Sequence, residues 1–187
     1  MTTPPHILAV DADSVDPADP INPMLDFIRG ASGGRLLGMH LQMASAPLVL
    51  DQYIALRRAI GAHATMPERA RAAVAVAASA TGRGEYTLAI NGMLARRVGW
   101  TAEQVNAIGD GYACGDAKLD ALLEVVREAV SRDGQVSDIT WRTAVNVGWT
   151  TTDLAETYGY IALVSYCDRF VRYAETAFDV AFAATAS

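Results

Sequence analysis

The chain has 187 residues and a mass of 19.9 kDa, a length that suits one domain with a hydrophobic core. It carries a net charge of −6, and 19% of its residues are charged while 51% are hydrophobic, whereas typical soluble domains are about a quarter charged. The acidic balance excludes nucleic acids and anionic membranes as expected partners, the two cysteines exclude a disulfide framework, and the three histidines leave little material for a metal site.

The N-terminal segment is rich in proline and aspartate, with five of the seven prolines between positions 4 and 23. Both residue types favour turns, so we predict an irregular arm over 1–22, followed by a single helical domain over 23–187. The arm lacks the basic and apolar regions of a signal peptide, and the longest apolar run, 72–78, is far shorter than the ~20 residues that span a bilayer. A cytoplasmic, thiol-reducing location is therefore expected.

The rest of the chain is predicted to be all-α, because no alternating stretch is long enough for a strand. Pro47 and Pro67 suit helix starts, where the N–H that proline lacks would be unpaired anyway. The segment after Pro67 is rich in alanine and apolar nearly all round, which predicts a helix buried on most sides. Helices are expected near 24–30, 34–44, 47–61, 67–80, 85–98, 102–110, 116–132, 137–147 and 151–184.

A four-residue motif occurs twice, as Val98-Gly-Trp-Thr101 and, 49 residues later, as Val147-Gly-Trp-Thr150. In each copy the glycine suits the left-handed residue that ends a helix, and the threonine suits the N-cap of the next helix. The motif therefore predicts a helix–glycine–cap–helix corner that is used twice. Two interpretations stay open, namely two similar corners or a duplicated helical hairpin.

Several further motifs follow one another in an order shared with a known family. They are Arg69-Ala-Arg71 with the apolar helix after it, Tyr86, Asn91, the segments 99–108, 116–123 and 136–138, and the region 148–151 before a long apolar C-terminal helix. Over roughly residues 34–180 the chain resembles the carboxymuconolactone decarboxylase/alkylhydroperoxidase D-like (AhpD-like) family. The resemblance implies an all-α AhpD-like helical bundle with an internal helical-hairpin repeat, an active site on a helical hairpin, and a homo-oligomer such as a trimer, a hexamer or a dimer.

The chain departs from the peroxidase branch of this family, in which a Glu, a Cys-x-x-Cys pair and a His carry the chemistry. Counted back from Gly99, the two Cys positions fall on Gly84 and Thr87. The His position falls on Asn91 and the Glu position on Ala72. Because all four chemical groups are missing, the thiol peroxidase reaction is not expected at this hairpin.

The decarboxylase branch lacks the cysteines, and the polar groups of this hairpin suit a pocket wall. Thr87 and Asn91 share a helix face at i, i+4, with Gly84 one turn back as a gap for a ligand. Asn91 could hold an enolate or carbonyl oxygen, and Tyr86 could move a proton if its pKa were lowered from ~10. His40 is a spare acid–base residue upstream. The candidate catalytic residues are Tyr86, Asn91 and His40, and the candidate substrate-binding residues are Arg83, Glu85 and Thr87.

Each of these residues also has a structural interpretation. Asn91 suits a helix-packing amide, and Tyr86 suits an amphipathic core residue. His40 lies among apolar residues and suits the core or a subunit contact, while Glu85 at a helix start would complement the helix dipole.

Three functional hypotheses remain, and we take the first as the working one. It is a cofactor-free and metal-free enzyme of the lyase, decarboxylase or isomerase type, acting on a small carbonyl- or lactone-bearing substrate. The second is a peroxidase that uses Cys114 and Cys167 in a rearranged site, although their separation of 53 residues favours two buried small hydrophobes. The third is a non-catalytic oligomeric member of the family.

Overall fold

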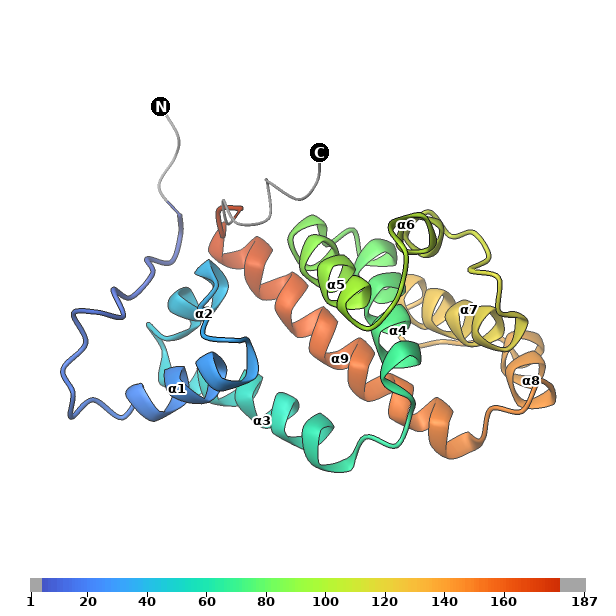
Figure 1. Cartoon of the computed structure of the whole chain (residues 1–187), viewed down its shortest axis with the longest axis horizontal. Coiled ribbons are helices and arrows are strands. Elements are labelled where there is room, and N and C mark those ends of the chain that lie inside the picture. The colour runs from blue at the N-terminus through green and yellow to red at the C-terminus, as the bar shows by residue number, and fades with distance from the viewer. Residues whose placement is uncertain (1–4, 179–187) are drawn as a thin grey trace. The chain divides into compact units, whose positions relative to one another are not determined.

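The computed structural model describes residues 5–178, which contain nine α-helices and no strand (Figure 1). The chain divides into two compact units. One comprises the described parts of Met1–Ala62 and Arg169–Ser187, and the other comprises His63–Asp168. The last helix, α9 (Thr151–Ala174), supplies residues to both units. The predicted all-α fold class is therefore confirmed for the described part of the chain.

The first unit contains α1 (Asn22–Ala31), α2 (Gly38–Met43) and most of α3 (Pro47–His63). Pro47 is the first residue of α3, as its sequence context predicts. The helix predicted over 34–44 begins four residues late, because Gly33 and Gly34 have positive φ angles of 67° and 87°. These left-handed glycines end the preceding segment and delay the next helix. The core of this unit is made by Leu25, Ile28, Met43, Leu50 and Ile54.

The segment before α1 consists of turns and bends that are attached by hydrogen bonds. Val10 N–H donates to the carbonyl oxygen of Leu41 at 3.0 Å. The buried Gln42 side chain donates to the carbonyl oxygens of Ile7 at 2.7 Å and of Ala174 at 3.3 Å. Gln42 thereby joins the arm to the end of α9.

The second unit is built around α4 (Glu68–Thr81), which packs against α5 (Glu85–Arg97), α6 (Ala102–Gly109) and α7 (Ala117–Ser131). Half of α4 is buried, including Ala73, Val74 and Val76, as its all-round apolar pattern predicts. Its alanines let the neighbouring helices approach closely. The remaining helices are α8 (Asp138–Asn146), which packs against α7, and the first part of α9.

Helices α4–α6 and α7–α9 form two copies of one three-helix unit. The same shift of 49 residues relates the starts of α4 and α7, the ends of α5 and α8, and the starts of α6 and α9. At the corners, Gly99 and Gly148 have φ angles of 93° and 98°. Thr101 and Thr150 then accept hydrogen bonds from the backbone N–H three residues on, which caps the next helix.

The two tryptophans of the corners make equivalent contacts. Trp100 Nε1–H donates to the carbonyl oxygen of Arg69 at 2.9 Å, and Trp149 Nε1–H donates to that of Lys118 at 2.7 Å. Each basic side chain then lies over the same indole ring, with Arg69 Cζ 4.0 Å and Lys118 Nζ 4.7 Å from the centroid. Because the partner lies 31 residues upstream in both cases, the predicted repeat extends beyond the corner to the whole three-helix unit.

Helix α9 ends earlier than predicted. The pattern predicts a helix over 151–184, but α9 stops at Ala174, and Glu175 has a left-handed φ of 52°. Thr176 N–H then turns back to the carbonyl oxygen of Val171 at 3.0 Å. The predicted part over 179–184 lies outside the described residues. No helix in the described chain is long and apolar enough to cross a bilayer.

Candidate functional site

The turn between α4 and α5 is short and closes on backbone hydrogen bonds. Gly82 N–H donates to the carbonyl oxygen of Ala78 at 2.9 Å, and Gly84 N–H donates to that of Ser79 at 2.8 Å. Arg83 between them has a positive φ of 56°. The tight turn makes a helical hairpin and brings the start of α5 next to the end of α4.

The polar face of α5 points into this hairpin. Thr87 is 2% exposed, and its hydroxyl donates to the carbonyl oxygen of Gly84 at 3.0 Å. One turn on, Asn91 Nδ2 donates to the hydroxyl oxygen of Ser79 at 2.9 Å, and Ser79 is fully buried on α4. Thr87 and Asn91 therefore lie on one face, as the i, i+4 spacing indicates, and both are held by specific hydrogen bonds.

The same hairpin contains a carboxylate that comes from α9. Asp168 is 4% exposed, and its Oδ1 accepts a hydrogen bond from the hydroxyl of Thr87. A Cβ atom on Gly84 would overlap this carboxylate, and one on Gly82 would lie 3.1 Å from Asp168 Oδ2. The glycine gap that was expected to receive a ligand is therefore filled by Asp168, which corrects that expectation.

Asp168 was missed by the sequence analysis because it lies 81 residues from Thr87 along the chain. The usable signal was a carboxylate on the buried stripe of α9, between Val164 and Val171. A charged residue on such a stripe requires a polar partner elsewhere in the fold. Nothing in the local pattern says which helix supplies that partner.

The other hairpin candidates lie at the start of α5. Tyr86 is buried at 4% exposure, which agrees with its interpretation as a core residue and leaves a role in proton transfer as a prediction. Arg83 and Glu85 are exposed. Glu85 is the first residue of α5, where a negative charge complements the helix dipole.

His40 belongs to the first compact unit, whereas the α4–α5 hairpin belongs to the second. Its Nδ1 accepts a hydrogen bond from Leu37 N–H at 3.2 Å, and its Nε2 lies 3.2 Å from the hydroxyl of Tyr53. Because Nδ1 accepts, the neutral ring carries its proton on Nε2 and donates it to Tyr53. Burial and the positive charge of Arg57 lower the pKa of His40 to about 4. The ring is therefore neutral near pH 7, with both nitrogens engaged.

Cys114 and Cys167 are buried and are not joined in a disulfide. Burial and a hydrogen bond with Asp120 raise the pKa of the Cys114 thiol. The thiolate is the nucleophilic form, so this environment opposes peroxide chemistry at Cys114. Among the described residues, no group of three His, Cys, Asp or Glu side chains could hold a metal ion.

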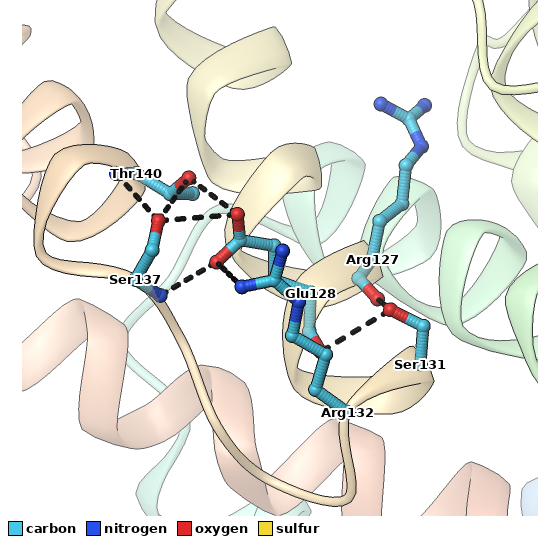
Figure 2. A network of polar contacts seen from close by, with 6 residues as sticks. All are labelled: Arg127, Glu128, Ser131, Arg132, Ser137 and Thr140. Carbon is cyan, nitrogen blue, oxygen red and sulfur yellow. Dashed lines mark hydrogen bonds and ion pairs between the residues drawn. The ribbon is translucent and has the colours of Figure 1, made fainter.

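The equivalent position in the second repeat is occupied by a different polar cluster, shown in Figure 2. Glu128 and Thr140 correspond by the 49-residue shift to Ser79 and Asn91, and Thr140 Oγ1 donates to Glu128 Oε1 at 2.9 Å. The helix-to-helix hydrogen bond of the first repeat is thus present in the second, with different side chains.

Glu128 is otherwise bound by the turn between α7 and α8. Ser137 donates its N–H to Glu128 Oε2 at 2.6 Å and its hydroxyl to Oε1 at 3.1 Å, and Arg132 lies 3.6 Å away (Figure 2). These hydrogen bonds, led by the Ser137 N–H and the Thr140 hydroxyl, lower the pKa of Glu128. This cluster joins α7 to α8 and is structural.

Comparison with solved structures identifies the fold. The debrominase Bmp8 in complex with 2,3,4-tribromopyrrole matches with a TM-score of 0.82 at 16% identity, covering 100% of this chain and 97% of the other. A peroxidase-related protein from Ralstonia eutropha JMP134, described as an alkylhydroperoxidase AhpD core, matches with a TM-score of 0.82 at 14% identity over 97% and 96% of the two chains. The chain has the AhpD-like fold.

A second peroxidase-related protein, from Silicibacter sp. TM1040, matches the AhpD-like fold of this chain with a TM-score of 0.79 at 14% identity, covering 97% of both chains. No protein-family profile and no curated protein matches the sequence. The fold implied by the family resemblance is confirmed, and at such low identity the chemistry has to be argued from the residues.

Proposed function

We propose that this chain is a cofactor-independent enzyme of the carboxymuconolactone decarboxylase/AhpD-like family that acts on a small carbonyl- or lactone-bearing substrate. The reaction class is a lyase, decarboxylase or isomerase. The observation that carries the proposal is the polar face of α5 in the α4–α5 hairpin, where buried Thr87 bonds to buried Asp168 and the partly exposed Asn91 bonds to buried Ser79. Buried polar groups cost stability unless each finds a partner, so such a group of polar residues beside the alanine-rich α4 is a candidate functional site.

Asn91 suits the stabilisation of a developing oxyanion. A carboxamide has two N–H donors, so Asn91 can keep its hydrogen bond to Ser79 and offer the second N–H to a substrate oxygen. Asn91 is partly exposed, whereas Ser79 behind it is fully buried. The serine therefore orients the amide, and the amide is the group that a substrate can reach.

Thiol peroxidase chemistry is the second candidate, because the similar structures include peroxidase-related proteins and a debrominase. The hairpin has no cysteine, and the raised pKa of Cys114 opposes its use as a nucleophile. If this alternative were right, the wild type would reduce hydroperoxides and replacing both Cys114 and Cys167 with serine would abolish that reduction. Under our proposal the double variant keeps the turnover of the carbonyl or lactone substrate.

The test is a screen of lactones and β-keto acids against the purified protein, followed by Asn91→Ala. Loss of an oxyanion donor lowers kcat by about 100-fold or more. The matched control is Thr140→Ala at the equivalent position of the second repeat, which should leave kcat unchanged. Unchanged turnover in both Asn91→Ala and Tyr86→Phe would contradict the proposal.

Three expectations from the sequence accompany this proposal. We expect a homo-oligomer because the chain has a low charged fraction of 19% and exposed apolar side chains such as Ile139 on α8. We also expect a cytoplasmic location and a small molecule, and neither nucleic acid nor membrane, as the partner. Light scattering with size-exclusion chromatography tests the first of these directly.

A further inference from the structure

Helix α8 is much less buried than its counterpart α5 in the first repeat. The structure describes both helices in full, and α8 has one buried residue, Ala144, whereas α5 has four. The 49-residue shift pairs Ile139 with Ile90, which is half-buried, yet Ile139 is 79% exposed. A surface that is partly covered within the chain in α5 is therefore open to solvent in α8.

The two sides of α8 have different surroundings. Thr140 and Ala144 are four residues apart, and Thr140 donates to Glu128 of α7, so this side faces α7 (Figure 1). Asp138 and Arg142 are also four residues apart, and each lies two positions from Thr140. Because two residues turn a helix by about 200°, this pair lies on the side of α8 that points away from α7.

Exposed apolar side chains flank this charged pair around the helix. Trp141 and Val145 lie on one side of the pair and Ile139 lies on the other, and all three are exposed. These five residues, Asp138, Ile139, Trp141, Arg142 and Val145, are called the α8 face. Exposed apolar patches bordered by polar residues mark protein–protein contacts, and tryptophan often supplies much of the binding energy there. The α8 face is therefore a candidate interaction surface.

The charges of the α8 face indicate what binds to it. Arg142 Nη2 lies 3.5 Å from Asp138 Oδ2, and both side chains are largely exposed. The face thus carries one positive and one negative charge, one helical turn apart. When two copies of this face meet as antiparallel helices about a two-fold axis, each charge lies opposite a charge of the other sign. A strongly acidic or basic partner would match only one of the two charges, whereas a second copy of the chain matches both.

We propose that the α8 face is the contact between two copies of this chain, which pair α8 antiparallel about a two-fold axis level with position 140. Positions 138 and 142 lie symmetrically about that level, as do positions 139 and 141. Asp138 then pairs with Arg142 of the partner subunit, and Ile139 packs against Trp141 of the partner subunit. Each contact occurs twice, once on either side of the axis.

Exchange of the ion pair between two copies explains why the charges and the apolar side chains occur together. Within one exposed helix, an ion pair at i, i+4 contributes little to stability, because water competes for both charges. Between two copies, the flanking apolar side chains exclude water and supply affinity, and the lower local dielectric strengthens the attraction of the charges. The charges also determine the direction of pairing, because parallel helices would place like charges opposite one another.

The experiment measures the mass of the full chain by sedimentation velocity over a range of concentrations. The wild type should form a dimer, or an even-numbered oligomer that contains this dimer. Asp138→Arg gives the face two positive charges and Arg142→Asp gives it two negative charges. Each single variant should therefore halve the mass, or raise the dissociation constant of the contact by about 10-fold or more. Ile139→Ser should raise it by about 10-fold through loss of the apolar contact.

Mixing the two charge variants tests the exchange directly. Each variant repels its own copies and attracts the other variant, so an equimolar mixture should form a heterodimer. The double variant Asp138→Arg/Arg142→Asp should self-associate as the wild type does, because its two charges have only changed places. A loss of association caused by misfolding would not be restored by mixing, and circular dichroism checks that each variant is helical.

The matched controls lie outside α8. Asp26→Arg makes the same change in the exposed Asp26–Arg29 ion pair of α1. Leu48→Ser removes an apolar side chain of α3 that is 71% exposed. Both variants should keep the mass of the wild type.

Three results would overturn the proposal. A wild type that is monomeric at all concentrations leaves the α8 face for a different partner. An oligomer with the same mass in Asp138→Arg and Ile139→Ser uses another interface. Single charge variants that stay monomeric when mixed exclude the exchange of ion pairs. The inference makes no use of the Asn91 site, so each of these results leaves the proposed function to the lactone and β-keto acid screen.

Discussion

The α4–α5 and α7–α8 hairpins occupy equivalent positions in the two repeats, yet their carboxylates come from different places. In α7–α8 the carboxylate is Glu128, which belongs to the hairpin itself and is bound by Ser137 of the adjoining turn. In α4–α5 the corresponding residue is Ser79, and the carboxylate is Asp168 from α9. One scaffold therefore carries a locally satisfied cluster and a cluster completed by a distant helix.

The lengths of the two turns explain the difference. The α4–α5 turn has three residues, 82–84, and two of them are glycines that leave space for a carboxylate to enter. The α7–α8 turn has six residues, 132–137, and folds its own Ser137 over Glu128. A long turn satisfies its carboxylate locally and exposes it, whereas the short glycine turn accepts a buried carboxylate from outside.

The largest loss of stability is expected when a side chain is added at Gly84 in the α4–α5 hairpin. Gly84→Ala places a Cβ atom on the carboxylate of Asp168, and such overpacking costs about 1–3 kcal/mol of unfolding free energy. Asp168→Ala in the same chain removes the overlap, so the double variant should lose less stability than the sum of the two single variants. Urea unfolding of the four proteins measures the coupling.

The control for this cycle is Gly159→Ala in α9, where a new Cβ meets no atom within 4 Å. Alanine is the better helix former, so this variant should be as stable as the wild type or more stable by up to about 1 kcal/mol. If the losses of unfolding free energy for Gly84→Ala and Asp168→Ala were strictly additive, the two residues would not be energetically coupled.

A smaller loss of stability is expected at the two Gly-Trp-Thr corners, and it should be the same at both. Trp100→Phe and Trp149→Phe each remove an indole N–H that donates to a backbone carbonyl 31 residues upstream. Each change should cost about 1 kcal/mol, because a neutral hydrogen bond contributes about that much net. Thermal or urea unfolding compares the two, and a large inequality would argue against equivalent corners.

The smallest effect is expected at Glu128 and should depend on pH. Hydrogen bonds lower the pKa of the folded-state carboxylate below its ordinary 4.5, so its contribution is present above that pH and is lost as the pH falls. Glu128→Gln should lower the unfolding midpoint near neutral pH and flatten the acid side of the stability profile. If Glu128→Gln had the same pH dependence of stability as the wild type, the polar cluster around Glu128 would not contribute to stability.

The helices themselves were largely predictable from local patterns. The all-round apolar segment after Pro67, the proline at the start of α3 and the repeated Gly-Trp-Thr corner each act within a few residues, and each has the predicted structure. The errors at α2 and at the end of α9 are also local. They arise from left-handed residues at Gly33, Gly34 and Glu175, and periodicity alone does not show these conformations.

The candidate site was only half predictable. The i, i+4 spacing placed Thr87 and Asn91 on one face, because helix geometry alone determines that relation. The partners of those residues depend on tertiary packing: Ser79 comes from the neighbouring helix, and Asp168 comes from 81 residues away. The local motifs thus determined an all-helical, AhpD-like chain whose hairpin carries no cysteine, since helix periodicity and capping are short-range. Only the tertiary structure decided that a buried carboxylate fills the glycine gap, because packing brings together residues whose sequence separation carries no local signal.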